Sequence, residues 1–320
     1  MFWRPPTVGD LRPALSLDPE SIGSEIVGRA QALAAYSHLV RTRRFIGALI
    51  EMPPLAEGPP QIVGLGGAMF VSESFFQEEI NDPRPGLNAR IIASVARKKP
   101  VVLSHDEVCR ANTADGLNVV ITQAALPSGL TLEETRAFEN VMSYAFFQLV
   151  RGYRLLRLFR EAASAAAIAH VKSQRVFERM VEFDAFHAAN PDTRWNRDRA
   201  LFVADREHCL ALPASVASML FSYSEPILHL HETDQELALA ALDGATDGEL
   251  ARVLHLKLPA LKKRWTSLFD RVGRVRPDLV PTAERDPADT RGPQKRHRLL
   301  AYLREHPEEL RPHIHQRSGR

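Results

Sequence analysis

The chain has 320 residues, of which 45% are hydrophobic and 25% are charged, a composition typical of globular proteins with room for two or three domains. Its net charge is only +2, so any affinity for nucleic acid must come from local clusters of charge. Cys109 and Cys209 are far apart and lack the CxxC spacing, which argues against a disulfide scaffold and fits a reducing compartment. The sequence has no apolar run long enough to cross a bilayer, and Met1–Asp10 lacks the apolar stretch of a signal peptide. We therefore expect a cytoplasmic protein with no membrane partner.

The first part of the chain alternates between helix and strand patterns. Residues 1–24 are interrupted by prolines and are predicted to form an N-terminal arm. A helix is expected over Glu25–Ile46, where small and apolar residues recur near one face. Further along, the sequence predicts a strand at Gln61–Val71, a short helix at Leu87–Ala96, and strands at Pro100–Leu103 and Leu117–Ala125.

A strong helix signal follows, because Thr131 and Glu134 have the spacing of a capping box. From there to about Phe186 the chain has one glycine and no proline, which predicts two or more helices. Part of this run could be a dimer-forming signalling helix, or the helices could pack antiparallel on their own domain. A small hairpin is expected next, with strands at Ala200–Ala204 and His208–Leu212.

The stretch from Asp234 to Val272 has the pattern of three short helices. Gly244 suits the left-handed end of the first helix, and Thr246 with Glu249 forms a capping box at the start of the second. The second helix presents small and apolar groups on its inner face, Ala251 among them. The third helix is predicted over Leu258–Val272, with a buried stripe of Leu261, Trp265, Leu268 and Val272.

The remaining faces of the third helix carry mainly basic side chains, namely Lys262, Lys263, Arg264, Ser267 and Arg271. A helix with a cationic exposed side, presented by two supporting helices, is suited to enter the major groove of DNA. Lysine and arginine there neutralise phosphates, and those near the N-terminus of the helix reach base edges. The alternative is a merely solvated charged face.

This stretch resembles the LuxR/GerE family of helix-turn-helix domains over about 40–45 residues. The residues that carry the resemblance are Asp234, Glu236 and Leu237, Gly244, Thr246–Asp247, Glu249–Leu250–Ala251 and Ala260–Leu261–Lys262. The chain departs from the family at His255, where glycine is usual, and at Lys257–Leu258–Pro259. The resemblance implies double-stranded DNA as a partner, with Lys262 and Lys263 at base edges or in the groove. It assigns Lys257, Arg264 and Arg271 to phosphates, and a homodimer is expected because one recognition helix contacts only a half-site.

The pattern over residues 25–160 resembles a GAF-like sensory domain, with the PAS fold as a rival. Neither resemblance assigns ligand-binding residues, so any small-molecule effector or cofactor is left unknown. The aromatic residues of acyl-homoserine-lactone receptors are not evident, since only Trp3 precedes residue 195 among the tryptophans. His105 and Cys109 stand four residues apart, but two ligands are too few for a metal site and core packing explains them better. No catalytic motif is apparent, and we do not expect an enzyme.

These expectations combine into an α+β chain that acts as a one-component transcriptional regulator. Its front domain would sense a small molecule, or would serve only for dimerisation. The alternative is an enzyme or cofactor-binding domain with a C-terminal helical protein-interaction module. The expected parts are an arm (1–24), a GAF-like domain (25–160), a helical connector with a small hairpin (161–228), a LuxR-type helix-turn-helix (229–276) and a flexible basic tail (277–320).

Overall fold

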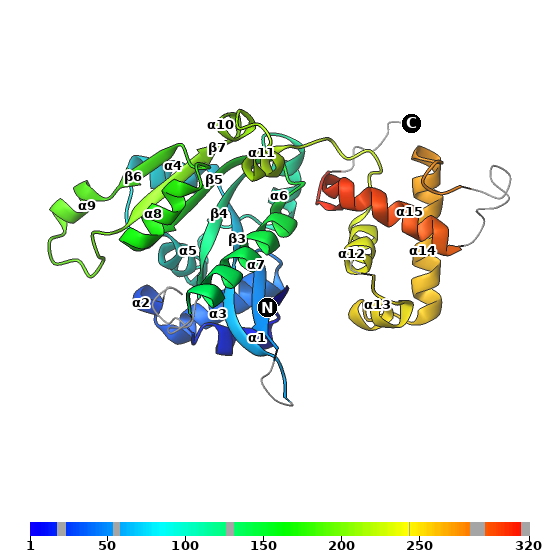
Figure 1. Cartoon of the computed structure of the whole chain (residues 1–320), viewed down its shortest axis with the longest axis horizontal. Coiled ribbons are helices and arrows are strands. Elements are labelled where there is room, and N and C mark those ends of the chain that lie inside the picture. The colour runs from blue at the N-terminus through cyan, green and yellow to red at the C-terminus, as the bar shows by residue number, and fades with distance from the viewer. Residues whose placement is uncertain (18–23, 54–57, 126–130, 243, 282–291, 315–320) are drawn as a thin grey trace. The chain divides into compact units, whose positions relative to one another are not determined.

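The structure is a computed structural model of the chain. It describes residues 1–17, 24–53, 58–125, 131–242, 244–281 and 292–314. The chain forms two compact units, Met1–Ser222 and Tyr223–Arg320 (Figure 1). Among the helices of these residues, none combines the length and the apolar character that a bilayer crossing requires.

The first unit is built on one seven-stranded sheet with the strand order β1-β2-β3-β4-β5-β7-β6. Neighbouring strands are antiparallel, except that β4 and β5 are parallel. The strands are β1 (Phe2–Arg4), β2 (Ile46–Met52), β3 (Gln61–Val71), β4 (Leu117–Ala125), β5 (Leu155–Ala162), β6 (Arg179–Glu182) and β7 (Ala200–Asp205).

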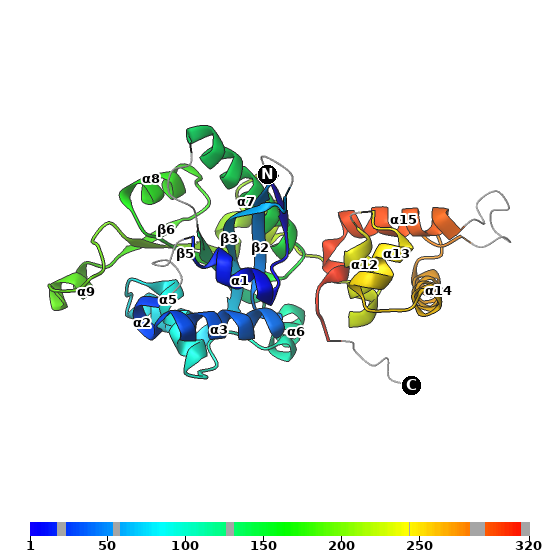
Figure 2. The same cartoon turned by 90° about the horizontal axis from the view of Figure 1, so that it is seen from below.

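Helices cover both faces of this sheet, so the unit has three layers (Figure 2). One face packs against α1 (Val8–Ala14), α2 (Ser24–Val27), α3 (Arg29–Arg41), α4 (Glu73–Asn81) and α5 (Leu87–Ala96). On the other face lie α7 (Leu132–Val150), α8 (Ala165–Ser173), α10 (Arg206–Leu210) and α11 (Val216–Phe221). The two remaining helices are α6 (His105–Thr113), which packs at β4, and α9 (Asp184–Ala189), which follows β6.

A close approach of two backbones explains Gly67 in the β2–β3 hairpin. Gly47 and Gly67 are opposite each other in the register of the two strands. A Cβ atom on Gly67 would lie 2.4 Å from the carbonyl oxygen of Ile46 and 3.0 Å from the ring of Phe45. Only a residue without a side chain fits there, so this glycine has a packing role in the sheet.

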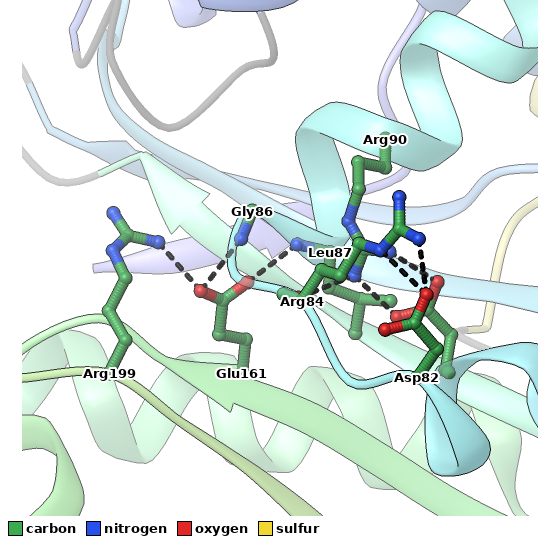
Figure 3. Close-up of polar contacts among 8 residues, drawn as sticks. Asp82, Arg84, Gly86, Leu87, Arg90, Glu161 and Arg199 are labelled. Carbon is green, nitrogen blue, oxygen red and sulfur yellow. Dashed lines mark hydrogen bonds and ion pairs between the residues drawn. The ribbon is translucent and has the colours of Figure 1, made fainter. Parts of the chain in front are cut away.

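A buried carboxylate ties α5 to the central sheet (Figure 3). Glu161 on β5 accepts hydrogen bonds from the backbone N–H groups of Gly86 (3.0 Å) and Leu87 (2.6 Å), and forms an ion pair with Arg199 at 2.8 Å. Gly86 has φ +80°, and a Cβ atom there would collide with the ring of Trp195. The negative charge lies at the N-terminus of α5, where the helix dipole favours it.

We predict that Glu161→Ala destabilises the first unit by about 2–3 kcal/mol, because two backbone N–H groups and a half-buried arginine lose their partner. Chemical denaturation followed by circular dichroism measures the change. Glu182→Ala, which removes an exposed carboxylate from β6, is the matched control and is expected to change the free energy of unfolding by less than about 0.5 kcal/mol. Equal effects of the two substitutions would contradict the role given to Glu161.

The predicted strands at Gln61–Val71 and Leu117–Ala125, the helix at Leu87–Ala96 and the Thr131–Glu134 capping box are confirmed. The helix expected over Glu25–Ile46 is divided into α2 and α3 and ends at Arg41, and Ile46 begins β2 instead. The strand expected at Pro100–Leu103 is reduced to a single bridge between Val71 and Val102.

The boundaries expected for the front domain differ from those of the structure. The arm (1–24) contributes β1 and the buried Leu11 and Ala14 to the first unit. The helical run expected from Thr131 contains only one long helix, since β5 follows α7 and pairs with β4. Residues 161–228, expected as a connector, hold β6 and β7, which complete the sheet. The strand expected at Ala200–Ala204 is confirmed as β7, but the hairpin is wrong, because the chain turns from β7 directly into α10.

The second unit is helical in its described residues. It comprises α12 (Glu232–Ala241), α13 (Asp247–Val253), α14 (Leu258–Val275), α15 (Gly292–Glu305) and the 3₁₀ turn η1 (Pro307–Leu310). One apolar core joins them. Leu299 and Leu303 of α15 and Leu310 of η1 are buried in that core, so the described part of the segment 277–320 is structural and not a flexible tail. Residues 282–291 and 315–320 of that segment lie outside the described residues.

A buried glutamate binds the end of this unit to its beginning. Glu309 accepts hydrogen bonds from the N–H groups of Ile227 and Leu228, both at 3.0 Å, and from the hydroxyl of Tyr302 at 3.2 Å. Burial next to this carboxylate raises the pKa of Tyr302 to about 12. The side chain of Gln235 donates to the carbonyl of Arg311 at 2.8 Å. The C-terminal residues therefore hold the start of the unit in place.

Candidate nucleic-acid interface

Local hydrogen bonds set the turns between α12, α13 and α14. Gly244 adopts the left-handed φ of +82°, and Thr246 with Glu249 forms the predicted capping box at the start of α13. At the end of α13 the N–H of Leu256 donates to the carbonyl of Ala251 at 2.8 Å, and the N–H of His255 donates to Arg252 at 3.3 Å. These two bonds form a Schellman motif, in which the residue with positive φ is usually glycine.

His255 occupies that left-handed position with φ +52°. We predict that His255→Gly stabilises the second unit by about 1 kcal/mol, because glycine adopts this conformation without the steric penalty of a Cβ atom. The thermal midpoint of unfolding measures the change. Arg252→Gly, one turn earlier in the helix, is expected to lower the stability by about 1 kcal/mol. A lower midpoint for His255→Gly would contradict the prediction.

The third helix of this set, α14, has one buried apolar face and one exposed polar face. The predicted stripe is confirmed, because Leu261, Trp265, Leu268 and Val272 are all buried. On the opposite side Lys263, Ser267, Asp270 and Arg274 are exposed and recur at intervals of four, three and four residues. This spacing places them along one line of the helix surface.

The structure places the predicted residues in two groups. Lys257, Lys262, Lys263 and Ser267 are exposed, with Lys257 at the N-cap position of α14. Arg264 and Arg271 are half-buried on the flank of the helix. From Lys257 to Phe269 the sequence has no acidic residue, whereas Asp270 precedes Arg274 by four positions and offsets its charge. The uncompensated positive charge therefore lies on the first half of α14.

Arg271 has a structural partner, which the sequence-based assignment to a phosphate did not anticipate. Its guanidinium forms an ion pair with Asp234 of α12, whose side chain is only 5% exposed. The buried carboxylate lies in the first turn of α12, which also favours its charge. Arg271 therefore joins α14 to α12.

We predict that Arg271→Met lowers the stability of the second unit by about 3 kcal/mol, because it leaves the buried Asp234 carboxylate unpaired. Denaturation monitored by tryptophan fluorescence measures this loss. The double substitution Arg271→Met with Asp234→Asn should recover part of it, since the unpaired charge is then removed. An unchanged stability of Arg271→Met, or no recovery in the double variant, would argue that the ion pair does not hold the helices together.

The helix α15, which lies in the segment expected as a flexible basic tail, contributes to this surface. The guanidinium of Arg296 lies 4.7 Å from the centre of the Trp265 ring, pairs with Asp247 at 2.8 Å and donates to the carbonyl of Ala245 at 2.7 Å. It thus binds α15 to the start of α13 and to the side of α14. A hollow of about 660 Å³ lies among these helices, and Lys262, Arg296, His297 and Arg304 are among its lining residues. The excess of basic residues in the C-terminal segment was the available signal.

The two cysteines singled out in the sequence belong to the first unit. Cys109 is half-buried on α6, Cys209 is buried, and the two form no disulfide. Burial raises the pKa of the Cys209 thiol to about 12, which disfavours the reactive thiolate. Within the described ranges no three histidine, cysteine, aspartate or glutamate residues lie in a group that could hold a metal ion.

The comparisons with known proteins found no match from which a family could be assigned to the chain. No protein-family model matches the chain, and a search of curated proteins finds no significant match.

Proposed function

We propose that Tyr223–Arg320 is a helix-turn-helix unit of the LuxR type, and that the chain is a one-component transcriptional regulator that binds double-stranded DNA. The observation that carries the proposal is α14, with one face fully buried and a basic, acid-free first half exposed. In a helix-turn-helix the second helix of the motif inserts its N-terminal residues into the major groove. The α13–α14 pair supplies these two helices, with α12 as the support behind them.

The exposed side chains divide into two roles in this proposal. Lys263 and Ser267 lie on the line opposite the buried stripe, so they face the groove and contact base edges. Lys262 flanks that line and Lys257 lies at the N-cap of α14, and both bind phosphates. The further cations lining the hollow beside Lys262 extend the positive surface toward α15. Arg271 is left out of the DNA contacts because it pairs with Asp234.

The first unit serves as the sensory part of the regulator in this proposal, with a GAF-like or PAS-like role. Its last helix, α11, ends at Phe221, directly before the second unit begins at Tyr223. A change in the first unit that shifts α11 therefore reaches the DNA-binding unit through the chain itself. The regulator acts as a homodimer in the cytoplasm, since a single α14 covers only one half-site.

We predict that replacing Lys262 and Lys263 with glutamate abolishes binding of the full chain to the DNA upstream of its own coding region. The test is a gel-shift titration over a range of salt concentrations. For the native chain log K should fall linearly with log salt concentration, with a slope of about −0.9 per phosphate contact. A milder variant, Lys262→Gln, should bind more weakly and reduce the slope by about one contact.

The control variant replaces Lys98 and Lys99, which are exposed in the first unit, with glutamate. It changes the net charge of the chain by the same amount and should leave DNA binding unaltered. A native chain that forms no salt-dependent complex with DNA would overturn the proposal. Equal losses in the two charge-reversal variants would reduce the effect to the overall charge of the protein.

A further inference from the structure

The first unit contains an apolar cavity of about 620 Å³ on the face of the sheet that α7 covers. Its floor is formed by Ile121 of β4 and by Leu158 and Arg160 of β5. The walls come from α7, from the segment between α8 and β6, and from α11 with the residues before it. Apolar wall residues include Met142, Phe146, Phe147, Phe177, Leu212 and Leu220. The volume is in the range of small-molecule sites in proteins.

Arg160 is the unusual member of this lining. It is half-buried, and its Nε atom is buried without a hydrogen-bond partner among the described residues. The charge that acts on it is that of Glu139, an exposed residue of α7 that forms no ion pair with it. Burial lowers the pKa of Arg160, as expected for a charge that leaves water without gaining a counter-ion.

A partly desolvated charge of this kind is unfavourable unless something pairs with it, and such groups are enriched at functional sites. The neighbouring residues of β5 illustrate the contrast. On the opposite face of the strand, Arg157 pairs with Glu73 and Asp205, and Glu161 pairs with Arg199. Arg160 alone on this strand directs its charge into an apolar cavity.

We propose that the cavity binds an amphipathic carboxylate, whose head group pairs with Arg160 and whose apolar part lies against Phe146, Phe177 and Leu220. The planar guanidinium of arginine matches a carboxylate through two parallel hydrogen bonds. The surrounding apolar walls take up a hydrocarbon chain or a ring. This chemistry excludes cations and strongly hydrated polar ligands.

The position of the cavity gives the ligand a route to the second unit. Ser215, Val216, Ala217 and Leu220 line it, and all but Ser215 belong to α11, whose last turn precedes Tyr223. Occupation of the cavity orders α11 and the segment before it. The binding site itself does not depend on the proposed function, whereas its effect on DNA affinity rests on that proposal.

The test measures binding of decanoate and of 1-decanol to the full chain by isothermal titration calorimetry, below the concentration at which decanoate forms micelles. The native chain should bind decanoate at least about tenfold more tightly than the alcohol, because only the carboxylate pairs with Arg160. Arg160→Met should weaken decanoate binding by about tenfold or more and leave 1-decanol within about twofold. Without ligand, Arg160→Met should unfold at a higher temperature than the native chain, since it removes a half-buried charge that has no ion-pair partner among the described residues.

Two further variants separate a specific site from general apolar binding. Arg175→Met removes an exposed arginine at the rim of the same cavity and should change decanoate affinity by less than about twofold. Ser143→Trp places a bulky ring at the exposed Ser143 of the lining and should weaken both probes by about tenfold or more. Equal affinity of the native chain for the two probes, or unchanged decanoate affinity in Arg160→Met, would overturn the proposal.

A gel shift with and without decanoate then tests the regulatory step. We expect the affinity of the native chain for DNA to change by about fivefold or more, and that of Arg160→Met to stay constant. If decanoate does not bind while salt-dependent DNA binding persists, the ligand site alone is overturned. If decanoate binds but DNA does not, the ligand site stands and the proposed function falls.

Discussion

The parallel pairing of β4 with β5 is the constraint on which the architecture of the first unit depends. Parallel neighbours cannot be joined by a tight turn, so the chain must cross over one face of the sheet before it returns. The crossover is α7, and it forms one wall of the apolar cavity. Because successive side chains of a strand point to opposite faces, β5 contributes side chains to the helical layers on both faces of the sheet. Its Glu161 fixes α5 on one side, while Arg160 faces the cavity on the other.

The second unit depends in a similar way on contacts between distant segments. The core of α12, α13 and α14 is completed by Leu299 and Leu303 of α15, and Arg296 fixes α15 through the ring of Trp265 and the carboxylate of Asp247. The same helix contributes cations beside Lys262. The basic character of α15 thus combines structural support with a positive surface, and a purely electrostatic interpretation of this segment is incomplete.

What the sequence predicted well was local. The capping boxes at Thr131 and Thr246, the left-handed Gly244 and the stripe along α14 all depend on residues within one or two turns of each other. The strand β5 was missed because its residues, LLRLFREA, favour helix as individual residues, and strand formation there depends on its neighbours β4 and β7.

Contacts between residues that are distant in the sequence were not predicted. Arg271 was assigned to a phosphate because Asp234, its partner, is 37 positions away in the sequence. The exposure of Lys262, Lys263 and Ser267 was predicted from helical spacing, whereas Lys257 was named from the family resemblance. Nothing in the sequence marked Arg160 as a cavity residue.

The hydrogen bonds from Ile227 and Leu228 to Glu309 also determine the order in which the two units fold during synthesis. Chains are synthesised from the N-terminus at about 5–20 residues per second, and domains fold as units when their residues have appeared. The sheet of the first unit is complete once β7 has been made. The second unit must wait for Leu310, the last core residue in the described part of the chain, although α14 has been translated earlier. A nascent chain therefore has its cavity before α14 is supported by its core, and an interrupted product would retain the cavity without the folded second unit.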